Sequence, residues 1–109
     1  MLDVRLYLAQ RISAMIMAPL VLGHLAVMIY AVQGGLDAGE ILARTQGSLM
    51  WGAFYGLFVV VAGIHAAIGL RVVVHEYLQV KGTALSLFTV AAALMFLVMG
   101  GRAVVAVVL

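Results

Sequence analysis

Three long runs of apolar residues dominate the chain, and short polar segments separate them. The runs cover residues 12–32, 48–70 and 83–101, and the last one can continue as far as Leu109. A helix needs about 20 apolar residues to cross the roughly 30 Å hydrocarbon core of a bilayer. The pattern therefore predicts an all-α membrane protein with three transmembrane helices in one anchor domain, residues 1–109.

The residues at the ends of these runs are typical of helix termini. Gly34 and Gly35 are expected to end the first helix, because glycine adopts the backbone conformations that close a helix. Asp37 or Ser48 can cap the helix that follows. Pro19 lacks an amide hydrogen, so we expect it to bend the first helix.

Positive charge is divided unequally between the two ends of the spans, which predicts the orientation. With three spans, the N-terminus and the second loop share one side, and the first loop and the C-terminus share the other. Lysine and arginine near helix ends favour the cytoplasmic side. Four basic residues lie on the side of the N-terminus: Arg5, Arg11, Arg71 and Lys81. The other side has two, Arg44 and Arg102. The N-terminus is therefore expected in the cytoplasm and the C-terminus outside.

Composition narrows the class of protein. The chain is 67% hydrophobic and 9% charged, against roughly 25% charged residues in a soluble domain. It has no cysteine, which excludes disulfides and thiolate ligation of iron–sulfur clusters. A net charge of +2 without a basic and aromatic block argues against nucleic-acid binding. Because both loops are too short for a soluble catalytic site, we expect a subunit or an anchor.

His65 is the most informative residue, because it lies deep inside the second apolar run. An ionisable side chain at that depth needs a partner. At 100° per residue, Ala62 and Gly69 flank His65 on the same face, and they leave room for a flat ligand such as a haem. A hydrogen bond to another helix and a place in a proton path are the alternatives. Spacing alone does not decide between them.

Three glycines of the second run form a strip almost opposite His65. Gly52, Gly56 and Gly63 fall on one side of the helix, in the small-residue pattern that allows another helix to approach closely. We therefore expect this face to contact a helix.

A second histidine, His24, lies in the first run, about 20 Å along the helix from Arg11. We expect His24 nearer the outer surface and His65 nearer the cytoplasm, so that they do not ligate the same iron. A hydrogen bond between helices is the alternative role for His24. Arg11 and Arg71 lie at the cytoplasmic ends of their helices. They can be interfacial anchors, or they can bind haem propionates or a quinone carbonyl.

These residues resemble a known family. The string His65-x3-Gly69-x-Arg71-x4-Glu76, with Arg11-Ile12-Ser13 at the start of the first span, resembles the cytochrome b membrane anchors of succinate dehydrogenase and fumarate reductase. The resemblance covers about residues 8–81, and size and topology are similar to the larger, C-type anchor. Glu76 stands where the family usually has aspartate.

The resemblance implies a function for each of these residues. His65 would be an axial ligand of haem b, Arg11 and Ser13 would help form the quinone site, and Arg71 would bind propionate or quinone. His24 resembles the second histidine of two-haem relatives, so the resemblance implies one haem and allows two. It implies three partners in a bacterial inner membrane: a second small anchor, an iron–sulfur subunit and a flavoprotein. The chain would not be catalytic alone. A haem-free structural anchor and a proton-relaying oligomer are the alternative hypotheses.

Overall fold

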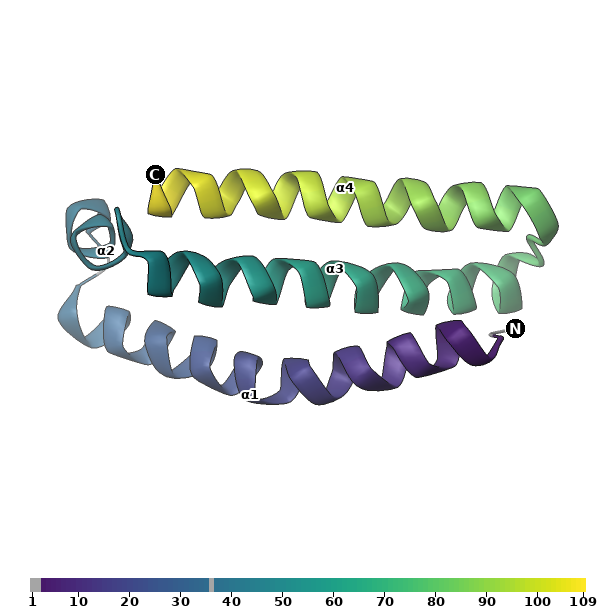
Figure 1. Cartoon of the computed structure of the whole chain (residues 1–109), viewed down its shortest axis with the longest axis horizontal. Coiled ribbons are helices and arrows are strands. Elements are labelled where there is room, and N and C mark those ends of the chain that lie inside the picture. The colour runs from purple at the N-terminus through teal and green to yellow at the C-terminus, as the bar shows by residue number, and fades with distance from the viewer. Residues whose placement is uncertain (1–2, 36) are drawn as a thin grey trace.

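The computed structural model describes residues 3–35 and 37–109, which form four helices (Figure 1). These are α1 (Val4–Gly34), α2 (Ala38–Thr45), α3 (Leu49–Leu78) and α4 (Gly82–Val108). Three of them, α1, α3 and α4, are long and apolar enough to cross a membrane, which confirms the predicted all-α fold with three spans. The α3 helix lies between α1 and α4, and the two ends of the chain lie at opposite ends of the bundle (Figure 1).

The spanning helices are longer than the apolar runs that predicted them. The first helix begins at Val4, eight residues before the apolar run, because Asp3 caps it by accepting a hydrogen bond from the Leu6 amide at 2.9 Å. Hydropathy marks the part of a helix that lies in hydrocarbon, whereas caps and polar turns extend it into the interface. With 30 residues, α3 is about 45 Å long, so both ends reach beyond a core of about 30 Å.

The short helix α2 was not predicted, and it lies across the end of the bundle (Figure 1). Asp37 caps it through the Gly39 amide at 3.1 Å, and Ser48 caps α3 through the Trp51 amide at 3.2 Å. Both of the proposed caps are therefore present. Glu40 in the first turn of α2 and Arg44 in its last turn complement the helix dipole.

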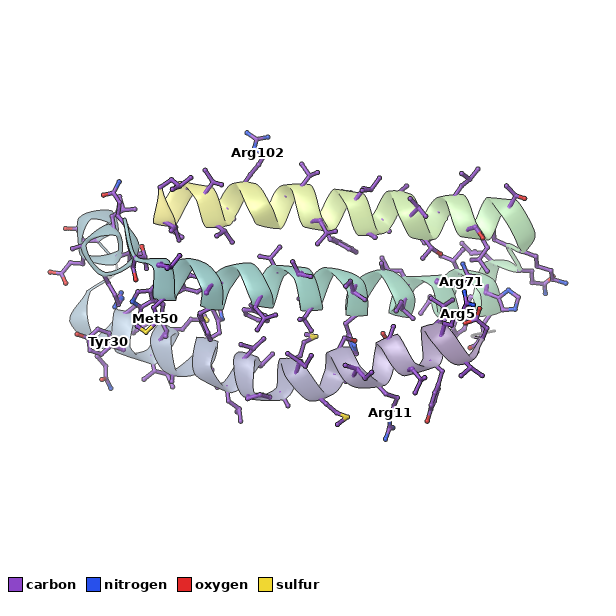
Figure 2. All side chains as sticks on the ribbon, viewed as in Figure 1. Arg5, Arg11, Tyr30, Met50, Arg71 and Arg102 are labelled. Carbon is purple, nitrogen blue, oxygen red and sulfur yellow. The ribbon has the colours of Figure 1, made fainter. Side chains whose placement is uncertain are left out.

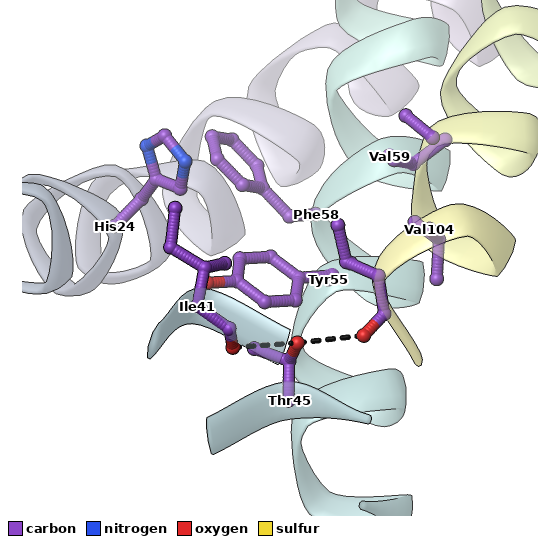
Figure 3. A pocket seen from close by; sticks show the side chains of 9 residues that line it. His24, Ile41, Thr45, Tyr55, Phe58, Val59 and Val104 are labelled. Atoms are coloured by element: carbon purple, nitrogen blue, oxygen red, sulfur yellow. Dashed lines mark hydrogen bonds between the residues drawn. The ribbon is translucent and has the colours of Figure 1, made fainter. Parts of the chain in front are cut away.

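Thr45 joins α2 to the end of α4 (Figure 3). Its side chain is 1% exposed, and its hydroxyl lies 2.6 Å from the Val107 carbonyl and 3.1 Å from the Ile41 carbonyl. The Gly47 amide donates to the Val108 carbonyl at 2.6 Å. The last carbonyls of a helix have no partner within the helix, so these bonds satisfy groups that hydrocarbon would leave unpaired.

Replacing Thr45 by valine should loosen this end of α4. The substitution keeps the shape but removes a donor to a buried carbonyl, which costs about 1–3 kcal/mol. We expect faster amide hydrogen exchange in the last turn of α4, measured by mass spectrometry. Thr83→Val, at an exposed threonine, is the control. Equal exchange in the two variants would show that the hydroxyl of Thr45 does not hold this end.

Glycines set the close packing of α3 against α4, as the glycine strip predicts. A methyl group on Gly63 would lie 3.3 Å from the Leu97 side chain, and one on Gly52 would lie 3.2 Å from Val108, both in α4. The prediction is thus confirmed for two of the three positions, since Gly56 has no such neighbour within 4 Å. The tightest approach is at Gly100 of α4, where an added methyl group would lie 2.5 Å from Val59.

Helix α1 packs on the other side of α3 and is bowed in the view of Figure 1. Pro19 lies inside this helix, and its missing amide hydrogen accounts for a bend there. At Gly23, an added methyl group would meet the ring of Phe54 at 3.4 Å. This contact fixes the register of α1 against α3, and the register decides which polar residues of the two helices meet.

Candidate functional site

The bond between Ser13 of α1 and His65 of α3 is the central feature of the site. The Ser13 hydroxyl lies 3.1 Å from Nδ1 of His65, and Ser13 is 5% exposed. The two residues are 52 positions apart in the sequence, and each comes from one of the two motifs in the chain. A hydrogen bond between helices, which the sequence left open as an alternative to cofactor ligation, is therefore present at His65.

The hydrogen bonds of Ser13 indicate which tautomer His65 adopts. Ser13 donates its one hydroxyl hydrogen to the Gln10 carbonyl at 2.9 Å. With that hydrogen directed at Gln10, the Ser13 oxygen is an acceptor, and a proton on Nδ1 of His65 would complete the bond. In that tautomer Nε2 carries a lone pair, and it makes no hydrogen bond within the described part of the chain. This is the state of a histidine that ligates a metal through Nε2 while its other nitrogen is held by the protein.

The side chain of Gln10 covers part of the space beside His65. Toward Arg71, the side chain of Gln10 lies over Gly69, with Nε2 of Gln10 3.8 Å from the position of an added methyl group. Oε1 of Gln10 is buried without a hydrogen-bond partner. Ala62, on the His65 face, also lines a cavity of about 260 Å³, but the other walls include Gly63 of α3 and Gly100 of α4, so this cavity opens toward α4 and not beside His65. Of the clearance expected from Ala62 and Gly69, the Gly69 part is therefore covered by the side chain of Gln10.

The two arginines of the motifs point in different directions. The Arg71 guanidinium donates to the Thr89 hydroxyl of α4 at 3.1 Å, and its Nε is buried without a partner. Arg11 is exposed and points away from the bundle (Figure 2). The chain therefore brings Ser13 to His65 but does not gather Arg11, Ser13 and Arg71 around one point.

His24 faces a separate cavity nearer to α2 (Figure 3). Its ring makes edge contacts with Phe58 and Tyr55, with centroid distances of 5.2 and 6.2 Å. The cavity measures about 380 Å³, and its walls come from all four helices. No hydrogen bond to His24 occurs within residues 3–35 and 37–109, so the expected alternative of a bond between helices is not seen there.

The two histidines lie at different levels, as the sequence predicts. His24 contacts Phe58, and Phe58 precedes His65 by two turns on the same helix, a rise of about 10 Å. One flat ligand with an axial bond to each histidine would need both side chains at one level. The structure therefore does not bring the two histidines to one such ligand.

Sequence reasoning missed one residue near His24. Arg44 of α2 borders a cavity of about 290 Å³ that His24 and Tyr55 also line. Its guanidinium carbon lies 5.0 Å from the centre of the Tyr30 ring, a cation–π contact, and its Nε is buried without a partner. In the sequence, Arg44 stands out only as an arginine in the loop between Tyr30, near the end of the first run, and Trp51, near the start of the second.

His75, the third histidine, has a local role. Its Nδ1 lies 3.0 Å from the Val80 carbonyl, five residues away, so it closes the turn after α3. Glu76 beside it is exposed. These residues lie at the end of the helix and outside the two histidine sites.

The fold and site define a multi-pass helical membrane protein with two separate intramembrane histidines. The sequence model of the succinate dehydrogenase/fumarate reductase transmembrane subunit family matches residues 1–101, so the chain belongs to this family. It is thus a membrane subunit of an enzyme complex and not a complete enzyme. Searches of curated proteins and of solved structures found no match.

Proposed function

We propose that this chain is the cytochrome b anchor of a bacterial succinate:quinone oxidoreductase, in which Nε2 of His65 ligates haem b. The observation that carries the proposal is the bond between Ser13 and His65. It supports the proposal because a proton on Nδ1 would leave Nε2 free to ligate the iron, and because it joins the two motifs that resemble the family's haem and quinone elements. A haem held between two histidines transfers single electrons and has no open coordination position.

The chain would supply one side of this haem. His24 and His75 do not lie at the level of His65, so a second protein ligand for the iron would come from the second small membrane anchor. Ala62 lies on the same face of α3 as His65, and its small side chain would leave room for a flat group. Ser13 would hold the His65 ring from α1.

Arg11 and Arg71 would bind the haem propionates or a quinone carbonyl. The exposed guanidinium of Arg11 is free to pair with a haem propionate or a quinone carbonyl from outside the three-helix bundle. Arg71, held by Thr89, would do so from the other side of α3. In this proposal Ser13 borders the quinone site, although its own hydrogen bonds go to Gln10 and His65.

His24 would ligate a second haem if the complex holds one. Its cavity is lined by apolar and aromatic side chains, and Arg44 lies beside it as a cation for a propionate. The partner anchor would again supply the opposite ligand. Loss of one of two spectral components in His24→Ala is the result expected from a two-haem complex. An unchanged spectrum indicates a single haem at His65.

Affinity purification of the tagged chain from its own membranes tests the proposed class. We expect a flavoprotein, an iron–sulfur protein and a second small membrane protein to co-purify, with a b-type band in the reduced-minus-oxidised spectrum. Purification of the same partners without the band would support a haem-free anchor. A homo-oligomer without soluble subunits would support the proton relay and refute the proposal.

Ser13→Ala should raise the midpoint potential of the haem without removing it. The Nδ1–H of His65 loses its acceptor, so the imidazole donates less electron density to the iron and the oxidised state is stabilised less. A tenfold change in the stability of the oxidised haem relative to the reduced haem corresponds to about 59 mV for one electron. Redox titration of Ser13→Ala should show an upward shift of the midpoint potential of roughly this size. Ser13→Thr keeps the hydroxyl, so its midpoint potential should lie close to that of the parent. Equal potentials in all three proteins would rule out this role.

A further inference from the structure

Arg102 lies in α4 six residues before the end of the helix at Val108, just beyond the apolar run 83–101, and like Arg11 of α1 it is a charged residue that faces outward from a long helix. It is exposed and points away from the bundle (Figure 2). Its neighbours Gly100 and Leu97 face α3, where they meet Val59 and Gly63. Arg102 therefore lies on the opposite side of α4 and has no partner within the described residues.

Contacts between the helices give the depth of Arg102. The bond from Arg71 places Thr89 at the level of Arg71, and Arg102 follows thirteen residues later, about 20 Å along α4. From the other end, Val108 packs at Gly52 near the start of α3, and Arg102 lies six residues, about 9 Å, short of that level. A hydrocarbon layer of about 30 Å that begins at Arg71 thus encloses Arg102, with about 10 Å to its nearer surface.

A guanidinium at this depth is unfavourable against lipid tails. Charged side chains within spans almost always pair with another protein group or face a water-filled space. Arginine can stretch toward the surface, but side chains of a helix lean toward its N-terminus. For Arg102 that direction leads toward the middle of the bilayer and away from the nearer surface. A partner in the membrane is therefore favoured over the lipid headgroups.

The surface around Arg102 is a shallow, open groove of about 510 Å³, and all the residues that line it belong to α4. Small residues on the same face, such as Gly101 and Ala106, allow another backbone to approach closely. The lining residues are Leu97, Val98, Gly101, Arg102, Val105 and Ala106.

The acidic residues of the chain argue against a second copy as the source of the counter-charge. The four of them are Asp3, Asp37, Glu40 and Glu76, and none lies in the part of α1, α3 or α4 that the layer beginning at Arg71 encloses. We propose that the Arg102 groove binds a transmembrane helix of a different polypeptide, which presents an aspartate or glutamate to Arg102 inside the membrane. This proposal does not depend on haem ligation by His65.

Photo-crosslinking in intact membranes tests this proposal with Arg102 unchanged. A benzoylphenylalanine residue at Val98, in the groove, should form adducts with one transmembrane peptide of another polypeptide that contains a carboxylate. The same probe at Val90, which is 56% exposed but outside the groove, should not give that adduct. Adducts with lipid alone, with a second copy of this chain, or with a helix that lacks an acidic residue would each overturn the proposal.

Variants of Arg102 give a second, independent measurement. Arg102→Ala leaves the partner carboxylate unpaired in the membrane, and co-purification of the crosslinked partner should fall roughly tenfold or more. Arg102→Lys should retain most of it, and Arg102→Glu should regain binding when the partner carboxylate is replaced by arginine. Unchanged co-purification in Arg102→Ala would contradict the proposal. If that variant fails to accumulate, the crosslinks formed with Arg102 intact decide the question.

Discussion

Replacing His65 by alanine is expected to remove its haem from the complex while the chain still inserts in the membrane. The substitution deletes the ligand atom Nε2, and the remaining residues near Ser13 offer no replacement. The b-type absorbance should fall to baseline in a one-haem complex, and to the contribution of the other haem in a two-haem complex. The measurement is a reduced-minus-oxidised spectrum of complexes purified in equal amounts.

His75→Ala is the matched control for this prediction. It removes the same side chain, and it also breaks a hydrogen bond of Nδ1, but at the turn after α3. We expect the haem content of this variant to be unchanged. Equal haem loss in both variants would indicate a general effect on assembly. Full haem content in His65→Ala would refute the assignment.

Gly100→Ala is expected to have the largest effect on the stability of the bundle among single methyl additions. The new methyl group would lie 2.5 Å from Val59, so α3 and α4 must separate or Val59 must move. Overpacking of this kind typically costs about 1–3 kcal/mol. The expected result is a lower thermal midpoint of the purified complex, because α4 packs on α3 through this contact.

Gly56→Ala is the control for the packing prediction. Gly56 lies on α3, but nothing lies within 4 Å of the position of its added methyl group. Since alanine also favours helix over glycine, this variant should be as stable as the parent or slightly more stable. If both substitutions lowered the midpoint equally, close packing at Gly100 would not be the cause.

The spans were predictable because membrane insertion depends mainly on local composition. The runs at 12–32 and 83–101 lie inside α1 and α4, and the run at 48–70 lies inside α3 except for Ser48, which caps that helix. Asp37 and Ser48 are caps as expected. Helix α2 was missed because eight residues contain barely two turns, too few for a clear period. Its position depends on Thr45 and the end of α4, which are 62 residues apart.

The site was predictable in its parts and not in their arrangement. His65 stands out in the sequence because a buried ionisable group is rare in a span, and the levels of His24 and His65 follow from helix rise. The pairing of Ser13 with His65 depends on how α1 registers against α3, which packing at Gly23 and Phe54 determines. The direction of Arg71 toward Thr89 likewise depends on the position of α4.

The ratio of haem to this chain in the isolated complex tests the central claim most directly. Extracted haem b is measured as its pyridine complex, and the chain is quantified by mass spectrometry with a labelled standard. Ligation by His65 predicts one haem b per chain, or two if His24 also serves as a ligand. A complex that is complete in its protein subunits but contains no haem b would contradict the claim.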